Sequence, residues 1–352
     1  MRLLRPRLHA DDPTGPRIVG MRVGVVGAGA VGGTIAALLA RAGHDVEVTA
    51  RGTHLEAMAE SGIRLRGAWG DADVVVRASP VLTRAPELVL VTTKAQDAVA
   101  AIRENIALLR GVPVVVVQNG LDGVAAAEAA SPRSDIIGGL ATFAASYLSP
   151  GEITVTAAGP TYLGVLGDDD LPARYAARLL ATVMPTTVTT NFVGAQWTKL
   201  IINQVNALPA ITGRSVQEVV AHAGLRRVLT ASIREAVRVA RRSKVRFEPL
   251  QGLGRRTLGL VRVLPLWAGA FLPRAMARRM GSVPNPGSTL QSIRRGQATE
   301  IDHLNGSVVR AASAAGREAP VNALMVELVH GVEESGRFLE PDEVVAAYRA
   351  LN

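Results

Sequence analysis

A glycine-rich turn near the start of the chain limits the fold more than any other feature. A hydrophobic run at residues 21–26 breaks into Gly-x-Gly-x-x-Gly, and alanine-rich sequence of helical character follows. This order is typical of a dinucleotide site, because the helix then begins where its free N–H groups can face a pyrophosphate. Gly27 permits the sharp turn, Gly29 lets backbone amides approach the phosphates, and Gly32 lets the helix lie close to the strand. The alternative is an α/β packing turn without a ligand. The predicted cofactor-binding residues are Gly27, Ala28, Gly29, Ala30, Val31 and Gly32.

The residue that follows the second expected strand, at 45–50, indicates which cofactor is used. An NAD-selective domain usually offers Asp or Glu here to the ribose 2′-hydroxyl, whereas this chain has Arg51. A guanidinium favours a 2′-phosphate because it can form paired, charge-assisted hydrogen bonds to it. Arg51 therefore predicts NADPH rather than NADH, and a solvated loop arginine is the alternative.

The composition indicates a globular protein of about two domains. Of 352 residues, 48% are hydrophobic and 20% charged, and 39 Lys and Arg against 30 Asp and Glu give a net charge of +9. Such a charge can suit nucleic acid or a membrane surface. Aromatic residues make up only 3%, however, and no helix-turn-helix or zinc pattern is present, so we expect an arginine-rich surface and no nucleic-acid partner.

The chain has no cysteine, which excludes disulfides and thiolate metal sites and suits a reducing cytoplasm, the expected location. The six histidines show no metal-ligand spacing, so no metal is predicted. Residues 1–20 lack the apolar segment of a secretory signal and are interpreted as an N-terminal extension. Translation starts at Met1 or at Met21, and mass spectrometry of the native N-terminus would distinguish the two.

Strands and helices alternate up to about residue 190. Uninterrupted valine-rich runs fit parallel strands buried on both faces. The predicted fold class is therefore α/β, with an N-terminal Rossmann-type doubly wound sheet at 21–190, in which the short strands after residue 138 extend the sheet's edge. Beyond the fingerprint, strands are expected at 72–78, 88–92, 112–117, 152–157, 161–165 and 186–190, with helices at 97–109 and 171–183.

Helical periodicity dominates the rest of the chain, so residues 191–352 are expected to form an all-helical domain for substrate binding and dimerisation. Its helices are expected at 196–208, 215–223, 225–243, 290–315 and 322–331. Residues 250–286 are interpreted as an insertion that is rich in arginine around an apolar run. That run is far shorter than the ~20 residues that span a bilayer. We expect a packed helical insertion or lid. A homodimer contact is less favoured, and membrane contact through a basic surface for anionic lipid is the least favoured.

Polar side chains mark candidate sites in both domains. Lys94 and Asn119 follow expected strands, at the sheet edge where ligands bind in such folds, although a loop cation and a turn asparagine would explain them too. Lys199, Asn203 and Asn206 share one face of an otherwise apolar helix. Burying them would be costly unless they faced a wet cleft or a polar ligand, and a solvated stripe is the alternative.

Five segments, in this order, resemble the ketopantoate reductase family. They are Gly-Ala-Gly-Ala-Val-Gly at 27–32, Thr-Lys-Ala at 93–95, Gln-Asn-Gly at 118–120, Trp-x-Lys-x-x-x-Asn at 197–203 and Thr-Glu-Ile-Asp-x-x-Asn-Gly at 299–306. The resemblance covers residues 21–334. It implies an enzyme in which NADPH reduces 2-dehydropantoate to (R)-pantoate in pantothenate and coenzyme A biosynthesis.

The resemblance also implies roles for single residues. Lys199 would donate a proton to the keto oxygen, and Glu300 would hydrogen-bond to the substrate hydroxyl. Asn203, Asn206 and Ser288 would bind the carboxylate and hydroxyl groups of the 2-keto acid.

For the cofactor, the resemblance implies that Asn119 contacts the nicotinamide half and borders the substrate. Lys94 would lie beside it, and Ala144 would match a backbone contact. Asp302 and Asn305 of the last motif are assigned to local helix structure instead.

The chemistry is consistent with a lysine donor, because hydride transfer to a ketone carbon develops negative charge on the oxygen. A carboxylate such as Glu300 would keep Lys199 charged, whereas burial would lower its pKa, and the sequence leaves open which effect dominates.

Two departures from the family pattern bear on the substrate. Asn206 follows Asn203 by three residues where the family has four, and no asparagine occurs around 213–215. The alternatives are therefore a related NADPH-dependent reductase of another 2-oxo acid, or a non-catalytic NADP-binding regulatory protein.

Overall fold

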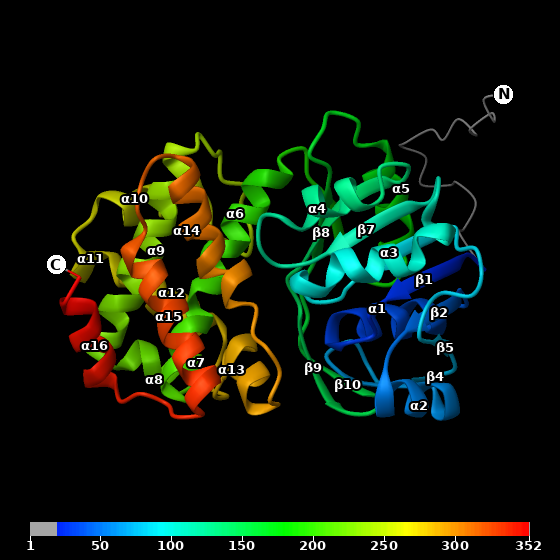
Figure 1. Ribbon diagram of the computed structural model, residues 1–352, viewed down its shortest axis with the longest axis horizontal. Coiled ribbons are helices and arrows are strands. Elements are labelled where there is room, and N and C mark those ends of the chain that lie inside the picture. The colour runs from blue at the N-terminus through cyan, green and yellow to red at the C-terminus, as the bar shows by residue number, and fades with distance from the viewer. Residues whose placement is uncertain (1–19, 352) are drawn as a thin grey trace. The chain divides into compact units, whose positions relative to one another are not determined.

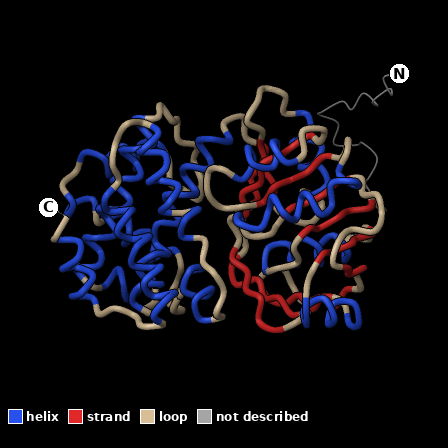
Figure 2. The backbone as a smooth tube through the Cα atoms, viewed as in Figure 1, coloured by secondary structure: helices blue, strands red, loops and turns tan. Residues whose placement is uncertain are grey.

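The computed structural model describes residues 20–351, so the expected N-terminal extension lies almost wholly outside the described residues. The chain divides into two units, with the main division between Thr190 and Asn191. Two short segments that follow strands, Lys94–Gln96 and Gln118–Ala126, belong to the second unit. We call the two parts the sheet unit and the helical unit. Strands are confined to the first of them, as Figure 2 shows by colour.

The main sheet of the sheet unit has eight strands in the order β12-β11-β8-β7-β6-β1-β2-β5. Figure 1 labels β8, β7, β1, β2 and β5 of this sheet. All neighbours are parallel except β11, which runs antiparallel to β8. This confirms the doubly wound α/β fold. The strands are β1 Arg22–Val26, β2 Asp45–Thr49, β5 Arg77–Ser79, β6 Leu88–Val91, β7 Pro113–Val117, β8 Asp135–Ala141, β11 Thr161–Gly164 and β12 Thr186–Val188.

A second sheet was not expected. It contains β3 Ile63–Gly67, β4 Ala72–Val74, β9 Ala144–Ser149 and β10 Glu152–Ala157, in the order β4-β3-β10-β9. The strand predicted at 72–78 is wrong, because the chain crosses at the exposed Val75 from β4 in this sheet to β5 in the other. The strand at 152–157 is present, but it pairs with β9 and β3 and does not extend the edge of the main sheet.

Helix α1 packs between the two sheets and forms the centre of this unit's core. Its Gly33 has no room for a side chain, because an added Cβ would lie 2.1 Å from Cδ1 of Ile153 in β10. The helices of this part of the chain are α1 Ala30–Arg41, α2 Gly52–Ser61, η1 Ala95–Asp97, α3 Ala98–Leu109, α4 Gly123–Ala130 and α5 Leu171–Leu180.

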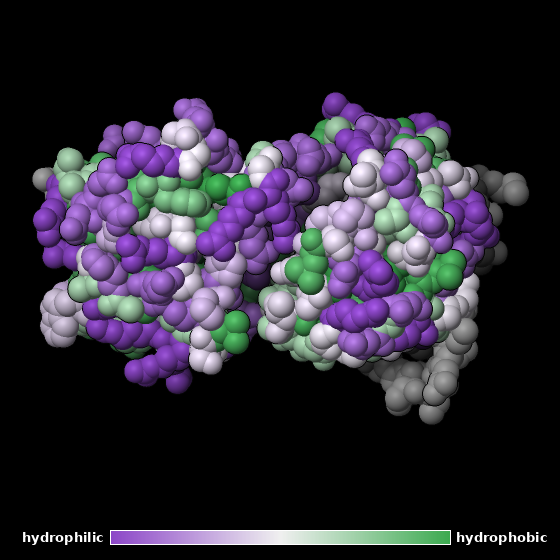
Figure 3. All heavy atoms as spheres, turned by 90° about the horizontal axis from the view of Figure 1, so that it is seen from below, coloured by the Kyte–Doolittle hydropathy of each residue, from purple (hydrophilic) through white to green (hydrophobic). Residues whose placement is uncertain are grey.

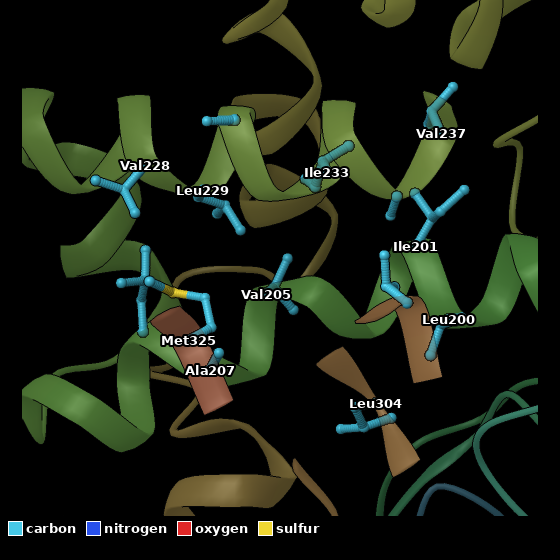
Figure 4. Packing of buried hydrophobic residues seen from close by; sticks show 14 of the residues in the cluster. Leu200, Ile201, Val205, Ala207, Val228, Leu229, Ile233, Val237, Leu304 and Met325 are labelled. Carbon is cyan, nitrogen blue, oxygen red and sulfur yellow. The ribbon is translucent and has the colours of Figure 1, made fainter. Parts of the chain in front are cut away.

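The helical unit is arranged around α9, a 20-residue amphipathic helix at Ala223–Arg242. Its Val228, Leu229, Ile233 and Val237 belong to the same buried cluster as Ile201 and Val205, which lie on the neighbouring segment in Figure 4. The other helices are α6 Phe192–Asn203, η2 Gln204–Asn206, α7 Ala207–Thr212, α8 Val216–Ala221, α10 Arg255–Val263, α11 Leu266–Gly269, α12 Phe271–Arg279, α13 Gly287–Arg294, η3 Ile301–His303, α14 Asn305–Ala314, α15 Pro320–Ser335 and α16 Pro341–Arg349.

Two predicted helices are interrupted. The helix expected at 196–208 becomes α6, the 3₁₀ turn η2 and α7, since Pro209 has no N–H to continue α-helical bonding to the carbonyl four residues earlier. The helix expected at 290–315 ends at Arg294, because Gly296 adopts φ +62° and turns the chain. The segment between α13 and α14 is therefore free to place Glu300.

Residues 250–286 form α10, α11 and α12, all three of which contact α9 (Figure 1). Leu258, Val261, Leu272 and Met276 are buried, whereas 80% of Trp267 is exposed. Among the described residues, no helix combines the length and apolarity that crossing a membrane requires. Charged and polar side chains cover most of the face seen in Figure 3, with apolar ones in small groups. Whether the insertion acts as a lid or as a homodimer contact stays a prediction.

Candidate active site

The glycine loop between β1 and α1 has three glycines with three different surroundings. Gly27 has φ +98°, and an added Cβ would lie 2.7 Å from Cγ2 of Thr93. At Gly32, a Cβ would lie 2.1 Å from the carbonyl oxygen of Gly27 and 2.2 Å from Oγ1 of Thr92. The fold itself therefore requires these two glycines. At Gly29 a Cβ would meet nothing within 4 Å, so only a molecule outside the chain would be obstructed by a side chain there.

The N-terminus of α1 can accept an anion. Its N-cap is Gly29, no side chain among the described residues caps it, and its first turn has no acidic residue. The first N–H groups of a helix have no partner within it and carry the positive end of the dipole. Thr92 Oγ1 donates to the Gly27 carbonyl over 2.5 Å, and the Gly27 N–H donates to Thr49 Oγ1 over 3.0 Å. The loop residues Ala28, Ala30 and Val31 complete the turn into the helix. Free donors and a fixed backbone fit the phosphates of a dinucleotide.

Arg51 lies two residues after the end of β2 and is the N-cap of α2. Its guanidinium donates to both carboxylate oxygens of Glu104 in α3, over 3.0 and 3.2 Å, while 76% of the side chain is exposed. An exposed ion pair of this kind is worth about 1 kcal/mol or less, so it leaves the cation available to an anionic ligand.

Ala144 is exposed at the start of β9. Its carbonyl accepts a hydrogen bond from Thr156 Oγ1 over 3.2 Å. The predicted backbone contact to the cofactor through this residue stays a prediction.

Lys199 lies half-buried in α6. Burial lowers the pKa of its ammonium to about 8. Within residues 20–351 its Nζ forms no hydrogen bond and no ion pair, with Glu300 or with any other carboxylate. Of the two opposing effects considered for this lysine, desolvation is thus the one that acts.

Asn119, Asn203 and Glu300 form a hydrogen-bonded chain within the helical unit. Asn203 Nδ2 donates to Asn119 Oδ1 over 3.0 Å, and Asn119 Nδ2 donates to Glu300 Oε2 over 3.3 Å. These contacts fix both amide orientations, and Glu300 Oε1 accepts no hydrogen bond from the described residues. The structure therefore brings together three of the residues that the sequence motifs selected.

Lys94 lies near the segment that carries Glu300. Its Nζ donates to the carbonyl of Ala298 over 2.6 Å and to Ser292 Oγ over 3.3 Å. These contacts hold the turn between α13 and η3, a role that the position of Lys94 after a strand did not reveal.

Asn206 and Ser288 complete the predicted set. Asn206 is 8% exposed, its Oδ1 lies 2.6 Å from where Gly287 would carry a Cβ, and its amide forms no hydrogen bond within the described residues. Side chains three residues apart eclipse in a 3₁₀ helix, so η2 keeps Asn206 on the same side as Asn203 despite the shortened spacing. Ser288 is exposed at the start of α13.

A cluster of His330, Asp302 and Glu333, which the sequence motifs did not reveal, holds the chain on both sides of Glu300. His330 Nδ1 lies 2.7 Å from Glu333 Oε2, and His330 Nε2 lies 3.2 Å from Asp302 Oδ1. Glu333 also accepts from the Thr299 N–H over 2.7 Å. Burial lowers the pKa of His330, but the hydrogen bonds to Asp302 and Glu333 outweigh it and raise the pKa overall. Asp302 thus links two helices, which its assignment to local structure did not predict.

Asn305, also assigned to local helix structure, is instead fully buried in a polar network. Its Nδ2 donates to Gln204 Oε1 over 2.8 Å and to Asn322 Oδ1 over 3.0 Å. The only sequence signal was its place in the last motif, since the three residues are far apart in the chain.

A dinucleotide-type glycine loop in one unit, and a desolvated lysine with a carboxylate and amides in the other, define an oxidoreductase built from two units. The comparisons with known proteins narrow this class. The family "Ketopantoate reductase PanE/ApbA" matches residues 23–168, and its C-terminal counterpart matches residues 191–333. The chain therefore belongs to the ketopantoate reductase family and is an enzyme.

Individual relatives agree with this assignment. The 2-dehydropantoate 2-reductase of Pyrococcus abyssi is 28% identical over 321 residues, which cover 89% of this chain and 98% of that protein. A PanE/ApbA family ketopantoate reductase from Ralstonia eutropha has a crystal structure with a TM-score of 0.76 and 30% identity, covering 89% and 99% of the two chains. A D-mandelate dehydrogenase solved with NADH and anilino(oxo)acetate has a TM-score of 0.78 at 20% identity, over 90% and 99%, and shares the fold.

Proposed function

We propose that this protein is an NADPH-dependent 2-dehydropantoate 2-reductase that produces (R)-pantoate. The observation that carries the proposal is Lys199, an amine that burial has brought to a pKa of about 8 and that has no partner among the described residues. Such an amine is suited to donate a proton to a ligand.

Three lysines occur in the chain, against 39 Lys and Arg in total. Two of them, Lys94 and Lys199, belong to the candidate site, while Lys244 is exposed elsewhere. An arginine stays protonated at all relevant pH values, whereas a lysine can release its proton when buried. A lysine at position 199 of an arginine-rich protein therefore supports a proton-donor role.

The glycine loop and the N-terminus of α1 would bind the pyrophosphate of NADPH, and Arg51 its 2′-phosphate. When bound, the nicotinamide supplies the hydride that reduces the keto carbon. Lys199 would stabilise the negative charge that develops on the keto oxygen and then protonate it. Its pKa near the working pH lets the amine regain a proton from water after each turnover.

The charges of the site suit a 2-keto acid anion. The ammonium groups of Lys94 and Lys199 outnumber the carboxylate of Glu300, which favours one negative charge on the substrate. Glu300, held by Asn119, would accept a hydrogen bond from the substrate hydroxyl, and Asn203, Asn206 and Ser288 would bind its polar groups. The hydroxyl contact is what separates pantoate precursors from 2-oxo acids without that group.

The decisive experiment compares two lysine variants. Lys199→Ala should lower kcat/KM for NADPH-dependent reduction by at least about a thousandfold, because both charge stabilisation and proton donation are lost. Binding of NADPH, measured by fluorescence titration, should persist. Lys244→Ala is the matched control and should retain full activity. An active Lys199→Ala enzyme would exclude the assigned donor.

Two further measurements separate the alternatives. A panel of 2-oxo acids at fixed NADPH identifies the substrate, and negligible turnover of 2-dehydropantoate beside rapid turnover of another acid would exclude the substrate assignment. If every acid fails while NADPH binds, the protein is a regulatory binder. Arg51→Asp should reverse the preference from NADPH toward NADH, while Glu104→Gln should leave NADPH preferred.

A further inference from the structure

His54, which no sequence motif selected, contacts the glycine loop from α2. Its Nε2 lies 2.7 Å from the carbonyl oxygen of Ala28, and the Gly151 N–H donates to its Nδ1 over 3.1 Å. A backbone N–H can only donate, so Nδ1 must be the unprotonated nitrogen. The imidazole is then neutral, carries its hydrogen on Nε2, and donates it to Ala28.

One further contact fixes the ring. Tyr147 of β9 packs edge-on against it, with ring centroids 4.6 Å apart. Gly151 lies in the turn between β9 and β10, so the second sheet sets both the tautomer and the orientation of His54. This gives a function to a sheet that the nucleotide-binding fold does not itself require.

The bond to Ala28 orients the peptide that enters Gly29. In a planar trans peptide the C=O and the following N–H point in opposite directions. With the Ala28 carbonyl held toward His54, the Gly29 N–H points away from the imidazole. The Gly27 carbonyl is held in the same manner by Thr92. Both loop carbonyls, which would repel an anion, are therefore bonded to side chains.

We propose that His54 is a positioning residue for the phosphate-binding loop: its neutral Nε2–H tautomer holds the Ala28 carbonyl so that the Gly29 N–H is directed to the cofactor's pyrophosphate. The inference rests on the proposed use of NADPH. It predicts that His54 acts on cofactor affinity and leaves the proton-transfer chemistry unchanged.

Two isosteric variants separate the two contacts of the ring. A glutamine amide reaches about as far as Nε2, so His54→Gln can still donate to Ala28. An asparagine amide reaches only to the place of Nδ1, so His54→Asn can accept from Gly151 but loses Ala28. The dissociation constant of NADPH should rise roughly 3- to 10-fold in His54→Asn, the cost of one hydrogen bond, and less than about 2-fold in His54→Gln. Equal affinity of His54→Asn and the wild type would overturn the proposal.

Two readouts exclude a general structural defect. The inhibition constant of adenosine 2′-phosphate, which has no pyrophosphate, should be the same in His54→Asn and the wild type, and kcat at saturating NADPH should also be unchanged. A parallel loss of 2′-phosphate binding would overturn the proposal. If the wild type itself fails to bind NADPH, the proposed function is wrong, independently of His54.

The tautomer can be tested without any substitution. In ¹⁵N-histidine NMR spectra of the wild-type protein, His54 should show a protonated Nε2 and an unprotonated Nδ1 at pH 8. The opposite tautomer would overturn the inference, whether or not the variants fold.

Discussion

The surroundings of Lys199 stabilise the positive charge of its ammonium group poorly. Burial lowers its pKa from 10.5 to about 8, and no carboxylate among the described residues compensates. For reduction of a ketone the protonated amine is the active form. We expect kcat/KM to be constant below about pH 7 and to fall roughly tenfold per pH unit above about pH 8.

Lys199→Arg is the control for this pH profile. A guanidinium keeps its proton over the whole range, so the residual activity of the variant should show no decline near pH 8. Steady-state rates between pH 6 and 10, in buffers of constant ionic strength, provide the measurement. A wild-type decline that begins only near the ordinary lysine pKa would contradict the assignment.

The same burial should cost stability. At neutral pH Lys199 is protonated in both the folded and the unfolded chain, and only the folded chain pays for desolvating the charge. The lowering from 10.5 to about 8 corresponds to about 3 kcal/mol as an upper value, so Lys199→Met should raise the free energy of unfolding by about 1–3 kcal/mol while abolishing activity.

The pH dependence of that gain has a definite sign. Between about pH 8 and 10.5 the unfolded chain binds more protons at this position than the folded chain does. The free energy of unfolding of the wild type therefore rises with pH in this window, and the advantage of Lys199→Met becomes smaller. Urea denaturation at pH 7 and pH 9.5 tests both statements, with Lys244→Met as the control that should gain nothing. A Lys199→Met protein less stable than the wild type at pH 7 would show that its packing, and not its charge, dominates.

At the scale of elements, α15 holds the segment between α13 and α14 through His330. The hydrogen bonds to Asp302 and Glu333 raise the pKa of His330, in spite of burial that lowers it. The two carboxylates stabilise the protonated form of His330. Its contribution to the free energy of unfolding is therefore fully present below the ordinary pKa of 6.5 and is lost as pH rises through the raised pKa.

His330→Ala should therefore lower the unfolding midpoint more at pH 6 than at pH 9. The effect should stay below about 1 kcal/mol, because 41% of the His330 side chain is exposed and water screens the pairs. Glu327→Ala, an exposed change on the same helix, is the matched control and should show no such pH dependence. An equal loss at both pH values would mean that His330 acts through packing alone.

Elements with one strong signal could be predicted from the sequence. Glycine spacing located the β1–α1 turn, and valine runs located β6 and β7. The strand at 72–78 failed because no glycine or proline interrupts these residues, although the chain passes there from one sheet to the other. The helix at 290–315 failed because helical periodicity continues across Gly296, whose positive φ ends α13.

The candidate site was predictable to the same extent. Motifs selected Asn119, Asn203 and Glu300, and the structure joins them by hydrogen bonds. The depressed pKa of Lys199 could not be predicted, because burial is set by residues distant in the chain. The same applies to His54, whose role depends on the position of the turn at Gly151.

At the scale of the whole molecule, the protein has two hydrophobic cores that share no residue. One contains α1 and the strands, and the other contains α9 and its neighbours. A ligand that binds one folded unit stabilises that unit by mass action, by about 2.7 kcal/mol at a hundredfold excess over its dissociation constant. Calorimetry should therefore show two transitions, of which NADPH raises the one that belongs to the sheet unit.

The three tryptophans make it possible to assign the transitions. Trp69 belongs to the sheet unit, while Trp197 and Trp267 belong to the helical unit. In a Trp69→Phe variant the intrinsic fluorescence follows only the helical unit, so its midpoint should rise less than that of the sheet unit when NADPH is added, since of the expected cofactor contacts only Lys94 and Asn119 belong to the helical unit. Because the phosphate loop and Arg51 both belong to the sheet unit, a fluorescence midpoint that rises as much as the calorimetric one would mean that the two cores unfold as a single cooperative body.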